Sequence, residues 1–299
     1  MYNRLESYID KNQILSNNQY GFRKNHSPYM AILNMCDKIT EAMDNKEFSV
    51  GVFIDLAKAF DTIDHSILID KLELYGIRGI ALSWFKSYLS HRSQYVTYNG
   101  CQSSMREVLL GVPQGSILGP LLFILYINDI NSCSEILHFI LFADDTNIFL
   151  SNRSLSVLEK ALNTELKKLS FWFMANKLTI NCKKSHYILF GKKSKLPSGS
   201  NIQIMLAGTL IDRVDKTKFL GFIIDEKLNW KEHVSTVSLK VSRNIGVMNR
   251  VKFLLPKPIL KLLYYTLVYP HLIYCVIVWG RASASALRKL ICVQKEQFV

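Results

Sequence analysis

The stretch that decides the fold is LHFILFADDTNIFL, residues 137–150. Two apolar runs of strand length flank Asp144 and Asp145, which predicts a β-hairpin with these acids and Asn147 at its turn. Adjacent carboxylates repel each other, so a plain turn gains nothing from the pair, whereas bound cations would remove the repulsion. Metal-dependent phosphoryl-transfer enzymes use such an arrangement. An ordinary acidic turn is the alternative, and other parts of the sequence decide between the two.

The composition is that of a basic globular protein. Of 299 residues, 37 are Lys or Arg and 24 are Asp or Glu, which gives a net charge of +13, and 49% are hydrophobic. Residues 226–299 hold twelve Lys or Arg and three Glu, a net charge of +9. This uneven distribution is typical of a protein that grips a phosphate backbone in one region and does chemistry in another. A generally basic protein without such a partner is the alternative.

Nothing in the sequence predicts secretion or a membrane span. The first residues contain no apolar segment of the signal-peptide kind, and the six cysteines form no C-x-x-C pair. The longest apolar stretch, residues 262–279, is interrupted by Pro270 and His271. We therefore expect an intracellular protein of the nucleus or cytoplasm, without disulfides or structural zinc.

Several further patterns surround the acidic hairpin. An apolar strand is predicted over residues 48–54 and ends on Asp55, so this carboxylate should lie at a sheet edge. Asn99-Gly100 between two strand-like runs predicts a second hairpin. Residues 111–120, GVPQGSILGP, form a Gly/Pro-rich loop before a helix, where backbone can approach a ligand. Pro28 after Ser27 predicts the start of a helix.

In this order, the motifs resemble those of reverse transcriptases, and most closely the polymerase domain of Jockey-like and related non-LTR retrotransposons. FIDLAKAFDTIDH (residues 53–65) and FADD (142–145) are similar to the two metal-binding motifs of that family. GVPQGSILGP is similar to its template and nucleotide loop, and QYGFRK (19–24) to its fingers motif. NKLTIN (176–181) with Lys184-Ser185 is similar to the motif after the long palm helix, and FLG (219–221) to the primer grip. The similarity covers nearly the whole chain.

The resemblance implies an α+β, right-hand polymerase with fingers, palm and thumb, whose antiparallel palm sheet is backed by helices. We expect partial fingers over residues 1–48 and the palm over 49–225, with an inserted fingers segment at about 66–108. A basic helical thumb would follow over 226–299. The match begins within the fingers and ends partway along a helix, so we expect a fragment of a longer mobile-element protein.

The resemblance also implies RNA-directed DNA synthesis, in which a primer 3′-hydroxyl attacks a dNTP. Two Mg²⁺ ions, with Mn²⁺ as an alternative, would be held by Asp55, Asp144 and Asp145. Successive strand residues point to opposite faces, so Asp144 is expected to bridge the ions with Asp55, and Asp145 to support them. The implied partners are an RNA template, a DNA primer and dNTPs, and no membrane; the sequence indicates no particular protein partner.

Other family positions receive their roles in the same way. The expected nucleotide-binding residues are Arg23, Lys24, Phe60, Gln114, Gly115 and Lys184. Phe60 would crowd the sugar 2′-position, and Lys184 would protonate the pyrophosphate; a core phenylalanine and a solvated lysine are the alternatives. The primer grip would be Phe219, Leu220 and Gly221, and the template–primer backbone would meet Lys240, Arg243, Arg250 and Lys252. Asp61, Asp64 and His65 are expected to be structural.

Two other functions share these features. A non-catalytic nucleic-acid-binding relic of a mobile element would keep the basic surface without turnover. An RNA-templated RNA polymerase would use the same acids, but would not need the bulk of Phe60.

Overall fold

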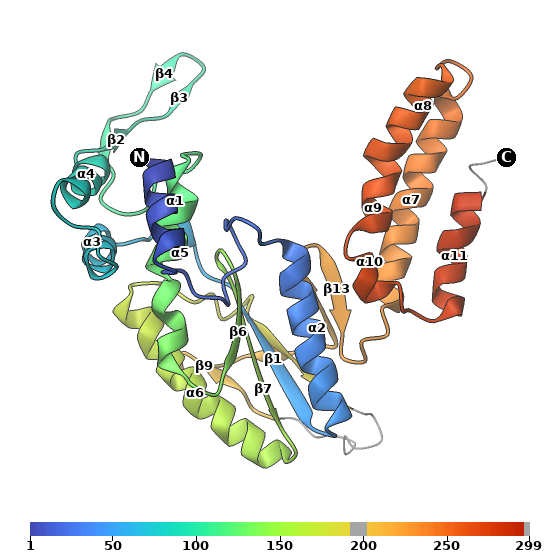
Figure 1. Cartoon of the computed structure of the whole chain (residues 1–299), viewed down its shortest axis with the longest axis horizontal. Helices are drawn as coiled ribbons and strands as arrows, with labels where there is room; N and C mark the ends of the chain where they lie inside the picture. Colours follow the sequence, from blue (N-terminus) through green and yellow to red (C-terminus); the bar gives the residue numbers. More distant parts are fainter. Residues whose placement is uncertain (192–201, 296–299) are drawn as a thin grey trace.

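The computed structural model describes residues 1–191 and 202–295. Residues 192–201 of the expected palm and 296–299 of the expected thumb lie outside this description. The described chain combines a central sheet, antiparallel except for one short edge strand, with helices on both of its faces (Figure 1). This is the predicted α+β class.

The central sheet has five strands in the order β11-β8-β1-β7-β6. Strand β1 (Phe48–Ile54) has the predicted bounds and pairs antiparallel with β7 (Asp145–Asn152) and β8 (His186–Phe190). Beyond β7 lies β6 (His138–Phe142), and β11 (Asp212–Arg213) pairs in parallel with β8. Strand β1 is apolar almost throughout because both of its faces are covered.

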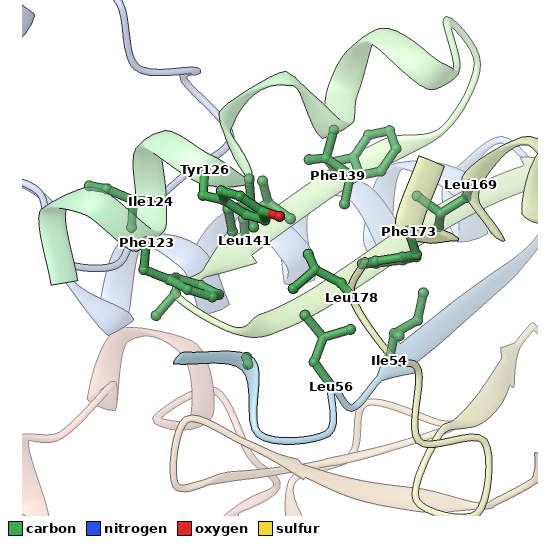
Figure 2. Close-up of a cluster of buried hydrophobic side chains, with 14 of the residues drawn as sticks. Ile54, Leu56, Phe123, Ile124, Tyr126, Phe139, Leu141, Leu169, Phe173 and Leu178 are labelled. Carbon is green, nitrogen blue, oxygen red and sulfur yellow. The ribbon is translucent and has the colours of Figure 1, made fainter. Parts of the chain in front are cut away.

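Two hydrophobic cores cover the two faces of the sheet. Helices α5 (Leu118–Tyr126) and α6 (Leu155–Ala175) pack on one face, where Figure 2 shows Leu169 and Phe173 of α6 beside Phe139 and Ile54 of the strands. Helix α2 (Pro28–Asp44), with proline in its first turn as predicted, packs on the other face. Burying each large aliphatic side chain stabilises the fold by about 1.5–3 kcal/mol, so these layers hold the sheet rigidly.

A helical group with a projecting ribbon stands at one side of the sheet (Figure 1). It contains α1 (Tyr2–Lys11), α3 (His65–Leu74) and α4 (Gly79–Leu89). The ribbon is made of β2 (Ser93–Gln94) with β5 (Arg106–Glu107), and β3 (Thr97–Tyr98) with β4 (Cys101–Gln102). Asn99 and Gly100 form its two-residue turn with φ of 48° and 80°, which confirms the predicted hairpin.

A second helical group stands at the opposite side of the sheet (Figure 1). The hairpin of β12 (Lys216–Phe219) and β13 (Phe222–Asp225) leads into α7 (Lys231–Val251). The remaining helices are α8 (Lys257–Leu263), the π-helix η4 (Tyr264–Val268), α9 (Tyr269–Ile273), α10 (Val276–Trp279) and α11 (Ala284–Lys295). The apolar stretch 262–279 is therefore broken into short helical pieces.

Three smaller elements complete the description, namely the 3₁₀ helices η1 (Ala59–Asp61) and η2 (Asn128–Cys133), and the short hairpin of β9 (Met205–Leu206) and β10 (Thr209–Leu210). Within residues 1–191 and 202–295, the structure contains no helix with both the length and the apolarity required to cross a bilayer.

Candidate active site

The acidic hairpin turns in only two residues. Phe142 pairs with Asp145, so Ala143 and Asp144 alone form the loop. Ala143 has a φ of 52°, a left-handed conformation that costs a non-glycine residue about 1–2 kcal/mol. The prediction that Asn147 belongs to the turn is wrong. Asn147 is a buried residue of β7, and its side-chain amide donates to the carbonyl of Ile140 across the hairpin, which satisfies it inside the sheet.

Asp55 is brought to the same end of the sheet by the register of β1 and β7. Ile54 pairs with Thr146, so Asp55 follows directly beside the start of β7 at Asp145. The backbone of Asp55 is fastened on both sides. Its N–H donates to Ser185 Oγ at 3.1 Å, and its carbonyl accepts from the N–H of Asn181 at 2.8 Å. The segment around residues 176–185 thus holds the first acid in place.

The three carboxylates act on one another electrostatically. Desolvation, followed by the negative charges of Asp144 and Asp55, raises the pKa of Asp145 to about 6. Across the described residues, none of the three carboxylates forms a salt bridge. Unpaired, mutually repelling oxygen donors fit a hard divalent cation.

This cluster is not a preformed metal cage. Among residues 1–191 and 202–295, no group of three or more His, Cys, Asp and Glu side chains is arranged to hold a metal ion. The side chains of Asp55, Asp144 and Asp145 would have to converge further on a cation. Mg²⁺ commonly keeps several waters and takes only one or two carboxylates, so the donor set remains chemically suitable.

The Gly/Pro-rich loop is tied to the segment that follows Asp55. Gln114 Nε2 donates to Asp61 Oδ1 at 2.6 Å, and His65 Nε2 lies 2.7 Å from the carbonyl oxygen of Gly111. A Cβ on Gly111 would lie 2.8 Å from Asp61, so only glycine fits there. Gly115 has a φ of 79° and keeps the exposed turn beside Gln114 in a left-handed conformation.

Asp64 has the structural role predicted for it. Its carboxylate caps α3 by accepting from the N–H groups of Ser66 and Ile67, and it pairs with Lys177 at 2.6 Å. Burial alone would raise the pKa of Asp64, but the hydrogen bonds from Lys177 and Ser66 outweigh it and hold the pKa well below its usual range. The bonds of Asp61 and His65 to the neighbouring loop are likewise structural.

Phe60 lies half-buried between two other aromatic rings. It stacks on Phe123 of α5 at a centroid distance of 4.3 Å and meets Phe22 edge-on at 6.4 Å. The core packing that we considered as one alternative is therefore present. The contact with Phe22 also brings Phe60 next to the loop that carries Arg23.

The loop with the two predicted cations borders a hollow beside the acidic hairpin. The hollow has a volume of about 480 Å³, and its lining includes Arg23, Lys24, Ile117 and Phe142. Lys24 is exposed, whereas the Arg23 guanidinium donates to the carbonyl of Ser16 at 2.7 Å. Because Phe142 directly precedes the turn, both cations lie on the approach to the acids.

The remaining predicted residues fall around this site in different settings. Lys184 is exposed and precedes Ser185, which holds Asp55. Leu220 and Gly221 form the tight turn between β12 and β13, with φ of 47° and 80°. Phe219 is only 3% exposed and packs toward Phe53, so it supports this turn from within and does not reach the surface.

The four predicted basic residues of the second helical group are all exposed. Arg243 and Arg250 lie on the side of α7 opposite its buried stripe, and their seven-residue spacing places them on one face, whereas Lys240 borders the buried stripe near His233. Lys252 follows directly after the helix. Within the described residues none of the four forms a salt bridge, and Lys252 lies over the ring of Phe253, so their charges are exposed and suited to a phosphate backbone.

Sequence reasoning missed the residues that hold the acids from behind. Gln19 accepts a hydrogen bond from the N–H of Ala143 at 3.1 Å, and Ser185 binds the backbone of Asp55. Gln19 lies in the motif of residues 19–24, and Ser185 follows Lys184 in another motif, but neither residue carries a charge that would mark it as functional. The sequence offers one signal, which is the glycine two residues after Gln19. Glycine lets another stretch of backbone approach closely, so Gly21 marks this segment as a candidate contact point.

Comparison with known proteins identifies the family. The model of the reverse transcriptase (RNA-dependent DNA polymerase) family matches residues 1–224. Over 98% of its length, the chain is 28% identical to the "RNA-directed DNA polymerase from mobile element jockey" and to the "Probable RNA-directed DNA polymerase from transposon BS", both of Drosophila melanogaster. It covers 32% and 33% of these proteins, so it spans about a third of the length of the curated relatives that it matches.

A solved structure also aligns with the chain. Telomerase from Candida albicans is 12% identical, with a TM-score of 0.47, and the alignment covers 97% of this chain and 54% of that one. This value is too low to support an inference about the present chain. The family match extends over three quarters of the sequence and includes all three acids, the loop with Arg23 and Lys24, the Gly/Pro-rich loop, and the β12–β13 hairpin as far as Ile224. The chain therefore belongs to the reverse transcriptase family and has its right-hand polymerase fold.

Proposed function

We propose that this chain is the polymerase region of a mobile-element reverse transcriptase, which adds dNTPs to the 3′-hydroxyl of a DNA primer on an RNA template. The observation that carries this proposal is the meeting of Asp55, Asp144 and Asp145 at one end of the sheet. Desolvation and the negative charges of Asp144 and Asp55 raise the pKa of Asp145, as expected where a partly desolvated carboxylate has like-charged neighbours.

The acids would hold two divalent cations, Mg²⁺ or Mn²⁺, with Asp55 and Asp144 as the bridging ligands and Asp145 in support. When bound, such ions stabilise the charge that develops on the attacking and leaving oxygens of a phosphoryl transfer. The fastened backbone of Asp55 and the two-residue turn that contains Asp144 fit this role, because both acids are held by ordered backbone.

The surrounding residues would bind and orient the nucleotide. Arg23 and Lys24 would neutralise the triphosphate from the hollow beside the hairpin. Gln114 would face the base and template from a loop that Asp61 fixes, with Gly115 allowing close approach. Phe60 would limit the space at the sugar 2′-position, and the exposed Lys184 would give a proton to the departing pyrophosphate.

The template–primer duplex would lie against the second helical group. We assign residues 1–48 to partial fingers, 49–225 to the palm with an inserted fingers segment at about 66–108, and 226–299 to the thumb. Leu220 and Gly221 would hold the primer end, with Phe219 as their buried support. Lys240, Arg243, Arg250 and Lys252 would meet the backbone without reading sequence. All six cysteines are free, in keeping with a reducing compartment, either nucleus or cytoplasm.

A primer-extension assay tests the proposal. With Mg²⁺, oligo(dT) and a poly(rA) template, we expect the chain to incorporate dTTP, and Asp55→Asn to reduce the rate by about a thousandfold or more. Asp37→Asn, a change of an exposed acid on α2, is the control and should leave the rate unchanged. Salt-dependent binding of the duplex without incorporation by the parent would instead show a non-catalytic relic.

Replacing Phe60 separates DNA synthesis from RNA synthesis. Phe60→Ala should raise the use of rNTPs relative to dNTPs by at least about tenfold, because the ring no longer crowds a 2′-hydroxyl. Phe171→Ala, at an exposed position of α6, is the matched control. A parent that already uses both nucleotides equally, with no change in Phe60→Ala, would favour an RNA-templated RNA polymerase.

A further inference from the structure

The segment just before Arg23 and Lys24 runs along β6, the edge strand of the central sheet. The N–H of Tyr20 donates to the carbonyl of Leu141 at 2.8 Å, and the N–H of Leu141 donates to the carbonyl of Asn18 at 2.9 Å. Gln19 and Leu141 thus form a parallel bridge beside β6. The backbone of this segment is thereby fixed to the strand that leads into the acidic turn.

The side chain of Gln19 reaches into that turn. Gln19 is 1% exposed, and its Oε1 accepts from the N–H of Gly21 at 2.7 Å and from the N–H of Ala143 at 3.1 Å. Ala143 is the left-handed residue directly before Asp144. Gly21 lies so close that a Cβ at this position would be 2.4 Å from the Ala143 nitrogen.

From these contacts we propose that Gln19 is a positioning residue for the catalytic acids, acting through the backbone of Ala143. This proposal rests on the proposed polymerase function, but its structural part can be measured without catalysis. The turn has an unfavourable backbone conformation and carries two acids that repel each other, so it needs an external hold to keep one geometry. A buried N–H that loses its acceptor is costly, so the bond to Gln19 selects the observed turn.

The amide oxygen of Gln19 is the atom that holds the turn. In the part of the chain that the structure describes, Gln19 Nε2 is buried and has no hydrogen-bond partner, whereas Oε1 has two. The length of the side chain also matters. An asparagine at this position could still accept from the N–H two residues on, as in an Asx turn, but its oxygen would fall short of Ala143.

Hydrogen exchange of the Ala143 amide in metal-free protein tests the proposal. Gln19→Asn keeps the local bond to Gly21 and loses the one to Ala143, and Gln19→Met loses both. Each should speed exchange at Ala143 by about tenfold, while the amides of α6 are unchanged. Thr146→Val is the matched control, because Thr146 is 1% exposed on the adjoining strand and its hydroxyl has no partner among the described residues. It should exchange like the parent.

Unchanged exchange at Ala143 in a folded Gln19→Asn or Gln19→Met protein would overturn the proposal. If neither variant folds, the parent itself decides. A through-hydrogen-bond coupling between the Ala143 nitrogen and the Gln19 side-chain carbonyl carbon is expected. Its absence, with the coupling between Tyr20 and Leu141 present, would also overturn it.

The catalytic consequence is a separate readout. In primer extension, Gln19→Asn should lower kcat by about tenfold with little change in the KM for dTTP, because the acids and not the nucleotide contacts are displaced. A parent that synthesises no DNA would refute the proposed function and leave the exchange result standing. Faster exchange with an unchanged kcat would overturn the positioning role while the function stands.

Discussion

At the scale of single residues, the carboxylates of the acidic turn lower the stability of the metal-free fold, although the proposed chemistry needs them. Desolvation and the charges of Asp144 and Asp55 raise the pKa of Asp145 to about 6, so its ionised carboxylate acts against folding of the metal-free chain at neutral pH. Asp145→Asn should therefore raise the melting temperature in EDTA at pH 7, while it lowers dTTP incorporation in Mg²⁺. Differential scanning calorimetry gives the first quantity. An equal rise in Asp37→Asn would show that the effect is one of net charge and not of the cluster.

The sequence indicates where the acids lie but not which residues hold them in place. Asp55 and the Asp144-Asp145 pair each follow an apolar run of strand length, so a common place at one end of the sheet can be inferred before any coordinates are known. Gln19 and Ser185 are uncharged, and their roles depend on contacts between segments more than a hundred residues apart. For Phe219, the resemblance of residues 219–221 to the primer grip suggests a residue that contacts the primer. The motif does not reveal that the Phe219 side chain is buried.

At the scale of elements, the root of α7 contains a titratable group buried in an aromatic cluster. His233 is 4% exposed, lies 4.1 Å from the ring of Phe222 and 5.9 Å from that of Trp279, and accepts from the N–H of Ile223 through Nδ1. Burial, with a smaller contribution from Lys240, lowers the pKa of His233 to about 4. The imidazole is therefore neutral in the folded chain at pH 7.

This depressed pKa makes the second helical group sensitive to acid. The unfolded chain binds the proton at a pKa of about 6.5, so stability is constant above that value and falls as the pH decreases toward 4. The loss should reach at most about 3 kcal/mol. His233→Phe should remove this slope in urea unfolding followed by tryptophan fluorescence, while His91→Asn at an exposed site should not. A parent whose stability is flat between pH 6.5 and 4.5 would contradict the assignment.

Elements with a single strong pattern were predictable, and composite ones were not. Strand β1 and the Asn99-Gly100 turn follow from a continuous apolar run and from a dipeptide that favours positive φ. The apolar stretch 262–279 is interrupted by Pro270 and His271. It forms several short helical pieces around Pro270, because packing against α7 and local breakers decide there and not periodicity.

At the scale of the whole molecule, charge is distributed to match the proposed division of labour. Arg243 and Arg250 share one exposed face of α7, on the side of the sheet opposite the projecting ribbon (Figure 1). Changing both to Ala should weaken binding of an RNA–DNA duplex at every sequence and make the slope of log affinity against log salt shallower by about 2.

The matched control for this change is on α6, where Lys160 and Lys167 have the same seven-residue spacing and are equally exposed. Replacing both lysines should leave the slope of log affinity against log salt nearly unchanged. Helix α6 packs in the hydrophobic core on one face of the sheet, whereas α7 packs in the core on the other face. Equal effects of the two pairs, measured by fluorescence anisotropy over a salt series, would show that binding depends on total charge alone.

The proposed division into fingers, palm and thumb rests on the order of the motifs and on their resemblance to the family. How these regions would bind nucleic acid depends on which basic side chains are exposed, and this cannot be read from the sequence pattern alone. The central claim is that Asp55, Asp144 and Asp145 form a metal-dependent site for templated DNA synthesis. The most direct test is the rate of single-dTTP incorporation on poly(rA)–oligo(dT) across a Mg²⁺ titration. We predict a Mg²⁺-dependent rate in the parent and a rate about a thousandfold lower in Asp144→Asn at every Mg²⁺ concentration; a variant that stays within tenfold of the parent would contradict the claim.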